Sequence, residues 1–542
     1  MADQDIERHA ANGTTTSSNV IVTTPNGPRH HTYGSFPAPG DTSPPDDPST
    51  GTASQPTVDA PVKPALKTRA VGPDLLRGAL MAFMALDHVS IFLRAFHHGT
   101  GNGNEEDGVV VHEWNRPVAY AVRTISHLCG PGFTFLLGMG VAYLSESRTR
   151  LGWSSAMLVR YYAVRAAVLT AITVLMGVLF TGGQVWFLNM VLFSLAVDLF
   201  LTGLLWIVIR RTEPALASCL ARFMPSSKAA SADDGATEPL LGQAQTQGYK
   251  DVATRARDAS RYIHHGFLLV LGVVTIWWNI WLSPYGGHCQ AAASEETPAP
   301  VPRIMGLQVK NPWLRLWFWP VMEPGTHVAS GFPPMAWLSF SILGLLYGRI
   351  LLSTRRSRHV LATGYAVVAL AFAALFVLTR VLRFGNLSES CMQTPEHEAH
   401  PNENPYLVSP ESFFYIIKYP PDVAFWAFTL AGNFALLAFF EALPLHISKR
   451  LTLLLDFGSS ALFFYILHLV VAAALGGVLT ALFGTERDFP NPLEPDAREK
   501  SIESIPVFFA TWAAVILIMW PLCRWYGRFK SQKPVDSVWR FF

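Results

Sequence analysis

Charged residues are scarce in this chain. Only 15% of its 542 residues are Asp, Glu, Lys or Arg, whereas 50% are hydrophobic, and a soluble protein of this length usually carries more charge. The formal net charge of +2 is too small to indicate binding to nucleic acid. The five cysteines include no CxxC pair, which argues against a zinc or redox motif. We therefore expect a membrane protein with no metal centre and no nucleic-acid partner.

The beginning of the sequence also lacks an apolar stretch of the kind that forms a secretory signal peptide. Residues 1–70 are instead rich in Pro, Ser, Thr, Gly and Asp, as in PAPGDTSPPDDPSTGTASQP. Such a segment cannot bury enough apolar surface to offset the entropy lost on ordering. We predict a disordered cytoplasmic tail over 1–70, a membrane domain over 71–530 and a short cytoplasmic tail over 531–542.

Long apolar runs recur throughout the membrane domain. Each is long enough to cross a hydrocarbon core of about 30 Å, which needs about 20 residues. Because backbone amides in lipid must be satisfied internally, each run is predicted to be a helix. The predicted fold class is an all-α polytopic helical bundle in the lipid bilayer. The predicted spans are 75–96, 119–145, 154–180, 184–209, 263–284, 332–353, 359–382, 422–445, 459–484 and 504–526.

The distribution of Lys and Arg between the loops supports a count of ten helices. Short loops rich in these residues stay in the cytoplasm, and with ten spans every basic loop falls on the same side as both termini. The same alternation predicts a flexible cytoplasmic loop over 212–258 and outer loops over 285–331 and 383–421. These outer loops contain Cys289 and Cys391. The sequence leaves open whether the two form a disulfide or remain free thiols.

Four polar side chains lie at bilayer depth in the first two predicted helices. Asp87 and His88 are near the middle of the first helix, and Arg123 and His127 are one turn apart in the second. A charge at this depth costs roughly 2.5–3.5 kcal/mol on insertion scales. At a rise of about 1.5 Å per residue, both histidines lie about 12 Å below the outer surface, where they can face one cavity. The alternative is that each only bonds a neighbouring helix, as we expect for His468.

Two further charges, Arg165 and Asp198, lie at matching depth in the third and fourth predicted helices. Pairing is how such charges are tolerated in a membrane. We therefore expect an ion pair between them, with phosphate binding by Arg165 as the alternative. Outside the membrane, His112 is a candidate general base, because an exposed imidazole titrates near neutral pH.

Several segments resemble the membrane family typified by the heparan-α-glucosaminide N-acetyltransferase catalytic domain. PDLLRGALMAFMALDHVSIF is similar to the first helix of that family, RTISHLCGPGFTFLLGMGVAYL to its second and FPPMAWLSFSILGLLYGRIL to a later one. DFGSSALFFYILHL is similar to a helix of related transmembrane acyltransferases. The likeness covers roughly residues 70–180, and the rest of the chain matches by helix count.

This resemblance implies transfer of an acetyl group from cytoplasmic acetyl-CoA to an acceptor on the luminal or outer side. In the lysosomal enzyme, a luminal-loop His shortly before a Trp-Asn pair is catalytic. His112-Glu113-Trp114-Asn115 is similar, with the His one residue closer to the Trp. His88 stands where that enzyme carries an active-site Asn, so the Asp-His pair looks more like the bacterial and fungal branch. The expected acceptor is a hydroxyl or amine of a small molecule or glycan, rather than heparan sulfate itself.

The resemblance and the residues together assign provisional roles. His88 or His112 is expected to remove the acceptor proton. Asp87 would tune the electrostatics around His88, and Arg123 or His127 would stabilise the oxyanion. The candidates for contact with the phosphates of acetyl-CoA also suit the ordinary role of positive-inside residues. These candidates are Arg148, Arg160, Arg165 and Arg349.

Two other functions stay open at this point. A transporter or flippase would suit polar groups at the midplane and Gly-rich helices equally well, although no second copy of the pattern in the first two helices is visible. The other is a non-catalytic membrane protein of the same fold. The sequence also leaves open a homodimer and the membrane concerned, whether lysosomal or vacuolar, another endomembrane or the plasma membrane.

Overall fold

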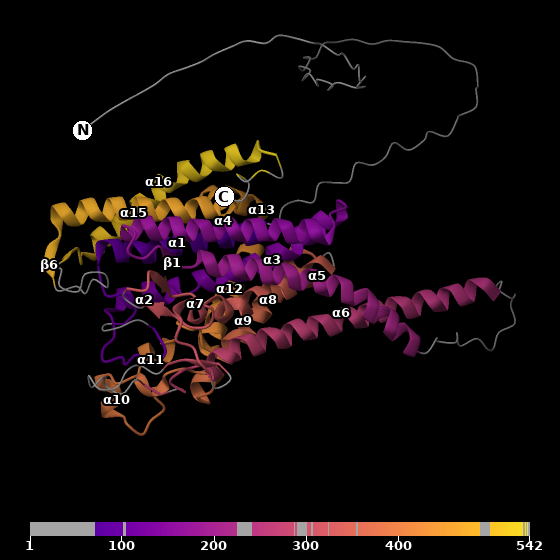
Figure 1. The fold of residues 1–542 in the computed structure, drawn as a ribbon, viewed down its shortest axis with the longest axis horizontal. Coiled ribbons are helices and arrows are strands. Elements are labelled where there is room, and N and C mark those ends of the chain that lie inside the picture. Colours follow the sequence, from indigo (N-terminus) through magenta and orange to yellow (C-terminus); the bar gives the residue numbers. More distant parts are fainter. Residues whose placement is uncertain are drawn as a thin grey trace, which may run out of the picture. The chain divides into compact units, whose positions relative to one another are not determined.

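The structure is a computed structural model (Figure 1). It describes residues 71–100, 105–224, 241–286, 288–289, 301–304, 307–322, 325–353, 356–487, 499–534, 537 and 539, without the side chains of 241–251. By its contacts the chain divides into Met1–Lys67 and Thr68–Phe542, and only the second part contains described residues. The predicted disordered tail over 1–70 lies outside the described residues, as do parts of the predicted loops over 212–258 and 285–331 and of the predicted tail over 531–542.

Ten helical stretches in the described part of the chain are long and apolar enough to cross a membrane. The chain is therefore an integral multi-pass membrane protein with an all-α bundle, as predicted, and the cytoplasmic placement of both termini stays a prediction. The stretches are α1 (Val71–Leu93), α2 (Pro117–Ser126) with α3 (Cys129–Arg150), α4 (Ser155–Thr181), α5 (Leu192–Phe223), α6 (Leu241–Trp281), α8 (Pro334–Ser353), α9 (Arg358–Val381), α12 (Val423–Ala442), α15 (Ala461–Phe483) and α16 (Ile505–Ser531).

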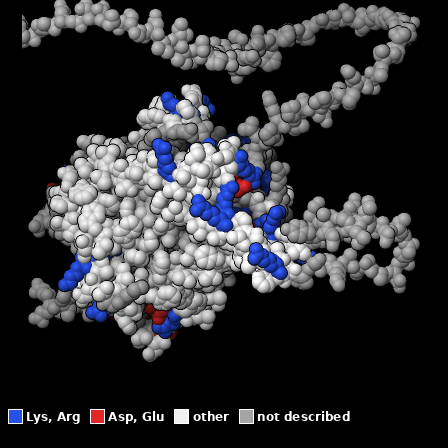
Figure 2. All heavy atoms as spheres, turned by 45° about the vertical axis from the view of Figure 1, so that its right-hand side comes forward, with Lys and Arg blue, Asp and Glu red and all other residues white. Residues whose placement is uncertain are grey.

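The bundle has two sides that differ in charge. The N-terminal side is where α1 begins and α16 ends, and the loop side carries the segments that follow α1, α6 and α9 (Figure 1). Figure 2 turns the N-terminal side forward, and Lys and Arg side chains gather there with few Asp or Glu beside them. This is the charge distribution expected of a cytoplasmic face.

The second span is interrupted at His127 and Leu128, between α2 and α3. Pro131 falls in the first turn of α3, where a backbone nitrogen has no partner within its own helix, so a proline is tolerated there. The interruption lies just before the pair Gly130-Pro131. The side chains on either side of this interruption lie next to the half of α1 that is nearer the loop side of the bundle.

The flexible loop predicted over 212–258 needs correction. Helix α5 continues to Phe223, and α6 already begins at Leu241. A hydrogen bond joins these two helices, since Ser260 Oγ donates to the carbonyl of Glu213 at 2.7 Å. The composition of the segment does not reveal this contact. A flexible loop therefore cannot extend over the whole predicted range.

Short strands and helices occupy the connections between the spans. In one sheet, β1 (Phe187–Asn189) pairs in parallel with β5 (Val328–Ser330), with Phe187 opposite Val328. On its other edge β5 pairs antiparallel with β4 (Val321–Met322). This sheet joins the α4–α5 turn to the segment that precedes α8. The remaining short elements are β2 (Arg303–Ile304), β3 (Leu307–Gln308), α7 (Pro312–Arg315), the 3-10 turn η1 (Glu389–Cys391), α10 (Pro395–Ala399), α11 (Pro410–Phe414), α13 (Leu445–Arg450), α14 (Thr452–Ser459), β6 (Thr485–Arg487) and β7 (Glu499–Ser501).

Helix α1 lies between two hydrophobic cores. Met84 and Val89 belong to a core shared with α15 and α16, whereas Leu76 and Leu80 belong to a core shared with α8 and α12. Figure 1 accordingly shows α1 between α15 and α3. Side chains of α1 can therefore meet helices from both ends of the sequence.

Cys289 and Cys391 are free thiols, which is one of the two alternatives left open by the sequence. They are nevertheless neighbours, since Cys289 Sγ lies 3.3 Å from Ser390 Oγ. Burial and a hydrogen bond with Cys289 raise the pKa of the Cys391 thiol. The two predicted outer loops are thus in contact without a covalent link.

Candidate functional site

A cavity of about 250 Å³ lies beside α1 on the loop side of the bundle. Its walls come from α1, the adjoining ends of α2 and α3, the three-stranded sheet, the segment before α12, and α15. Apolar side chains such as Phe133 and Phe332 form much of its surface. Its polar lining side chains are Asp87, His88, His98, Ser126, Cys129, Asn189, Lys418, Tyr419 and Tyr465.

His88 of α1 and His468 of α15 contact each other at this cavity. His88 Nδ1 lies 2.8 Å from His468 Nε2, and the two rings are nearly parallel, with an interplanar angle of 16° and their centroids 5.1 Å apart. His468 is fully buried, and its Nδ1 lies 2.9 Å from the carbonyl of Phe464, one turn earlier. The prediction that His468 bonds a neighbouring helix is confirmed, and its partner is the candidate base.

The Phe464 carbonyl fixes the proton positions of the pair, because a carbonyl oxygen can only accept. His468 must therefore donate from Nδ1, which leaves a lone pair on its Nε2. His88 donates to this lone pair from Nδ1, so the neutral His88 ring carries its own lone pair on Nε2. No group in the described residues bonds that nitrogen. His88 thus offers an unpaired basic nitrogen in a side chain that lines the cavity.

Lys418 is a candidate functional residue that the sequence analysis missed. It is only 7% exposed and lines the same cavity. Its Nζ lies 5.4 Å from the ring centre of Phe332 and 5.1 Å from that of Tyr419, with no carboxylate at ion-pair distance among the described residues. A buried ammonium is costly without a polar partner, and the cavity is where such a partner can bind. The signal in the sequence was a lone Lys within the run YIIKYPP.

Behind the cavity, acceptors surround Arg123 of α2. Its guanidinium donates to both carboxylate oxygens of Glu105, at 2.8 and 2.6 Å, and to Asp87 at 3.2 Å. His98 Nε2 lies 2.7 Å from Arg123 Nη1, and His127 Nε2 lies 3.3 Å from the Glu105 carboxylate. The structure therefore brings the predicted residues Asp87, Arg123 and His127 together, but only Asp87 of the three lines the cavity.

The charges of this cluster follow from its burial. Burial alone would raise the pKa of the Glu105 carboxyl, but the adjacent Arg123 guanidinium holds it well below its ordinary value. Burial and the charge of Arg123 lower the pKa of His98 to about 3. At neutral pH, Glu105 is ionised and His98 is neutral, so acceptors occupy the Arg123 guanidinium. Arg123 therefore connects α2 to Glu105, His98 and Asp87. Because these groups already accept its hydrogen bonds, it is poorly placed for the predicted oxyanion role.

A second cavity of about 360 Å³ adjoins the first and extends toward the N-terminal side. Its lining is largely apolar, but Arg77 of α1, Arg165 of α4 and Lys530 of α16 also line it. We call the two cavities together the corridor. The wall residues that they share are Phe133, Val191 and Tyr465.

The second candidate base, His112, does not line the corridor. Its side chain is exposed and follows Val111, whose backbone N–H donates to the carbonyl of Cys391 at 2.8 Å. In the same segment, Asn115 Nδ2 donates to the backbone carbonyls of residues 97 and 99, at 3.0 and 2.8 Å. The Trp-Asn motif therefore anchors this segment near His98, while the structure keeps His112 apart from the cavity lining.

Of the four arginines predicted to contact acetyl-CoA, only Arg165 lines the corridor. Arg148 lies over the ring of Trp153, 4.8 Å from its centre, and Arg160 is exposed on α4. Arg349 pairs with Glu213 in a separate cavity. The positions of Arg148 and Arg160 fit the alternative role of positive-inside residues.

The predicted ion pair between Arg165 and Asp198 is wrong. Arg165 donates to the Tyr161 hydroxyl at 3.1 Å, whereas both carboxylate oxygens of the fully buried Asp198 have no hydrogen-bond partner among the described residues. The two residues lie at matching depth in the membrane, but depth does not determine the direction in which each side chain leaves its helix. Thr202, one turn after Asp198, donates to Ser341 of α8 at 3.0 Å, so this face of α5 is directed toward α8.

Within the described ranges, no three His, Cys, Asp or Glu side chains are placed to hold a metal ion. Comparison of the sequence with protein-family models gives no match, and comparison with curated proteins gives none either. A functional assignment therefore depends on the chemistry of the corridor and on the resemblance of the helix motifs.

Proposed function

We propose that this membrane protein is an acetyltransferase that moves an acetyl group from acetyl-CoA, bound from the N-terminal side, to a hydroxyl or amine acceptor on the loop side. The observation that carries the proposal is His88 Nε2, which forms no hydrogen bond with any described residue and belongs to a side chain that lines a cavity. A second, largely apolar cavity with cationic side chains adjoins it. Acyl transfer needs a base for the acceptor proton and a cation or hydrogen-bond donor for the developing oxyanion. His88 and Lys418 provide both.

The corridor suits the size and charge of the proposed donor. Arg77 and His88 are eleven residues apart on α1, which corresponds to about 16 Å along the helix. The phosphopantetheine arm of CoA has a comparable length. The cations Arg77, Arg165 and Lys530 would contact the phosphates, while apolar walls would keep water from the thioester.

In the proposed reaction, His88 Nε2 takes the proton of the acceptor hydroxyl or amine as the acceptor atom attacks the thioester carbon. The Lys418 ammonium stabilises the negative charge on the former carbonyl oxygen. His468 stabilises the imidazolium by accepting the hydrogen bond from His88 Nδ1. When the tetrahedral intermediate collapses, the carbon–sulfur bond breaks and the CoA thiolate takes the proton from His88 Nε2.

The proposal is tested with the purified full-length chain in lipid vesicles, labelled acetyl-CoA and a panel of hydroxyl and amine acceptors. We expect His88→Gln to lower the transfer rate by about 10²–10⁴-fold and Lys418→Met by about 10²–10³-fold. The matched controls are His112→Gln and His359→Gln, which alter exposed histidines and should leave the rate unchanged. Full activity of His88→Gln would refute the assigned base.

The wild-type chain provides the more general test. Acetyl-CoA that binds and yields a labelled acceptor supports the enzyme. Absence of both binding and transfer for every acceptor would refute the proposal and leave the transporter and the non-catalytic membrane protein.

A further inference from the structure

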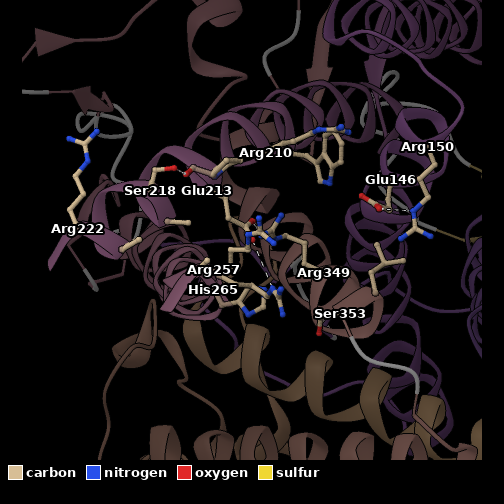
Figure 3. A pocket seen from close by; sticks show the side chains of 17 residues that line it. Glu146, Arg150, Arg210, Glu213, Ser218, Arg222, Arg257, His265, Arg349 and Ser353 are labelled. Atoms are coloured by element: carbon tan, nitrogen blue, oxygen red, sulfur yellow. Dashed lines mark hydrogen bonds and ion pairs between the residues drawn. The ribbon is translucent and has the colours of Figure 1, made fainter. Parts of the chain in front are cut away.

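A separate cavity of about 960 Å³ lies on the N-terminal side, between the C-terminal parts of α3, α5 and α8 and the middle of α6 (Figure 3). It shares no lining residue with the corridor. Two glutamates and six arginines line it, so its wall carries a large excess of positive charge. The arginines are Arg150, Arg210, Arg222, Arg257, Arg261 and Arg349.

The two glutamates balance only part of this charge. Glu146 pairs with Arg150 of the same helix at 2.8 Å. Glu213 pairs with Arg349 at 2.5 Å and lies 3.9 Å from Arg261. The two lining carboxylates therefore engage three of the six arginines.

The other three arginines have no carboxylate at ion-pair distance within the described ranges. Arg210 lies over the ring of Trp206, 5.4 Å from its centre, and neither Arg222 nor Arg257 forms a described ion pair. Figure 3 shows Arg257, Arg349 and His265 grouped near the middle of the cavity. Arg257 of α6 and Arg349 of α8 thus lie close together in this space, and the side chains of Arg210, Arg222 and Arg257 are also exposed to solvent.

Two nitrogens at this place also lack partners. Arg349 Nε and His265 Nε2 are buried and form no hydrogen bond with any described residue. The Arg349 side chain is only 12% exposed, so its Nε–H is a donor removed from bulk solvent. A buried donor without an acceptor costs free energy, which a ligand rich in acceptor oxygens would recover.

We propose that this cavity binds a multiply phosphorylated anion. Phosphate oxygens accept pairs of hydrogen bonds from guanidinium groups, which makes arginine clusters suited to phosphate recognition. Several cations from different helices match a ligand with several phosphate groups, and the cavity has the volume of a small-molecule site. Such a ligand is either a phosphorylated lipid headgroup or a soluble phosphate. This site is distinct from the corridor and goes beyond the proposed acetyl transfer.

The chain contains a matched control for ordinary positive-inside charge. Arg211 follows Arg210 directly, and Arg255 lies two residues before Arg257, yet neither Arg211 nor Arg255 lines the cavity. The double variants Arg210→Gln/Arg257→Gln and Arg211→Gln/Arg255→Gln remove the same charge from the same two helices. Only the first pair alters the cavity.

Binding is measured on the full-length chain in nanodiscs with two probes. One is inositol 1,4,5-trisphosphate in solution with neutral-lipid nanodiscs, and the other is phosphatidylinositol 4,5-bisphosphate within the nanodisc bilayer. We expect Arg210→Gln/Arg257→Gln to raise the dissociation constant of the bound probe by at least about tenfold, because charge-assisted hydrogen bonds are lost. The Arg211→Gln/Arg255→Gln control should bind like the wild type.

Saturable binding of the soluble probe would indicate that the ligand is a soluble phosphate. Binding of the lipid probe alone would indicate that it is a lipid headgroup. Either result supports the site. Equal weakening by both double variants would overturn it, because surface charge alone would then explain binding. Binding of neither probe would also overturn it. Displacement of the probe by acetyl-CoA would assign the cavity to the acyl donor and overturn a second site. Acetyl transfer is measured separately on the wild type, so the two proposals fail independently.

Discussion

At the scale of single residues, the contact between His88 and His468 determines which nitrogen can act as a base. The Phe464 carbonyl orients His468, and His468 in turn accepts from His88 Nδ1. This chain of two hydrogen bonds keeps the His88 lone pair on Nε2 and would stabilise the imidazolium formed during proton transfer. His468 does not line the cavity next to His88, so its proposed role is to position and tune the base.

Substitution of His468 should separate positioning from simple packing. His468→Leu removes the acceptor for His88 Nδ1, and we expect kcat to fall by about 10²-fold with KM for acetyl-CoA unchanged. His468→Gln keeps an oxygen that can accept the same hydrogen bond and should restore part of the rate. The measurement is the pH profile of kcat for both variants. A Leu variant whose profile coincides with that of the wild type would leave His468 a purely structural role.

Asp87 and His88 could be recognised from the sequence because ionisable side chains stand out in an apolar run. Their partners could not be recognised in the same way. His468 is 380 residues away from His88, and Lys418 lies within the predicted outer loop over 383–421, where the run around it does not show that its side chain is buried. Position along the sequence gives the depth of a side chain, but its neighbour depends on how the helices are rotated against one another.

At the scale of helices, α3 and α8 approach each other backbone to backbone. A Cβ atom at Gly138 would overlap the carbonyl oxygen of Ser341, and one at Gly344 would overlap that of Phe135. Small residues allow membrane helices to pack at such short separations. Since α8 ends beside the arginine-lined cavity and α3 forms a wall of the corridor, this interface positions both sites.

Substitutions on α3 should therefore have opposite effects two residues apart. Gly138→Ala places a methyl group against the α8 backbone and should destabilise the protein by about 1–3 kcal/mol. Gly140→Ala meets nothing within 4 Å and should stabilise it by up to about 1 kcal/mol through helix propensity. Thermal unfolding in detergent measures both. A Gly138→Ala variant as stable as Gly140→Ala would contradict the close α3–α8 packing.

The ten spans could be predicted because the length and composition of a membrane helix follow from the thickness and polarity of the bilayer. Other features depend on contacts between helices and could not. The polar extension of α5 is helical beside α6, where Ser260 meets Glu213. Asp198 was assigned to Arg165 by depth alone, whereas its face of α5 is directed toward α8.

At the scale of the whole molecule, Glu105 connects distant parts of the chain on the loop side. Its carbonyl accepts from the backbone nitrogens of Lys418 and Tyr419, at 3.0 and 3.1 Å. Its carboxylate holds Arg123 of α2, which reaches Asp87 of α1. The base and the cation of the proposed site are therefore joined through one buried charge cluster, and the stability of that cluster depends on pH.

Several groups of the loop side that lie outside the spans have shifted pKa values, among them His98, Glu105 and Asp422. Burial and Arg123 lower the pKa of His98 from 6.5 to about 3. Its contribution to stability is therefore fully present above pH 6.5 and is lost as the pH falls toward 3. The pKa of Glu105 is held well below 4.5, so its contribution is lost only below that pH. Asp422 acts oppositely: burial raises its pKa to about 6, and its contribution is lost as the pH rises through this value.

The difference between the wild type and His98→Asn isolates the His98 contribution, because Glu105 and Asp422 are present in both proteins. Above pH 6.5, the wild type holds a neutral His98 against Arg123 Nη1 at 2.7 Å and should have the higher Tm. As the pH falls from 6.5 to 4.5, the unfolded wild type gains a proton that its folded state resists, so the difference in Tm should shrink. Thermal unfolding of both proteins in the same detergent across this range measures it. The difference in Tm could instead stay constant or widen toward acid pH. That result would mean that His98 is protonated in the folded cluster and that Arg123 is not held by the neutral ring.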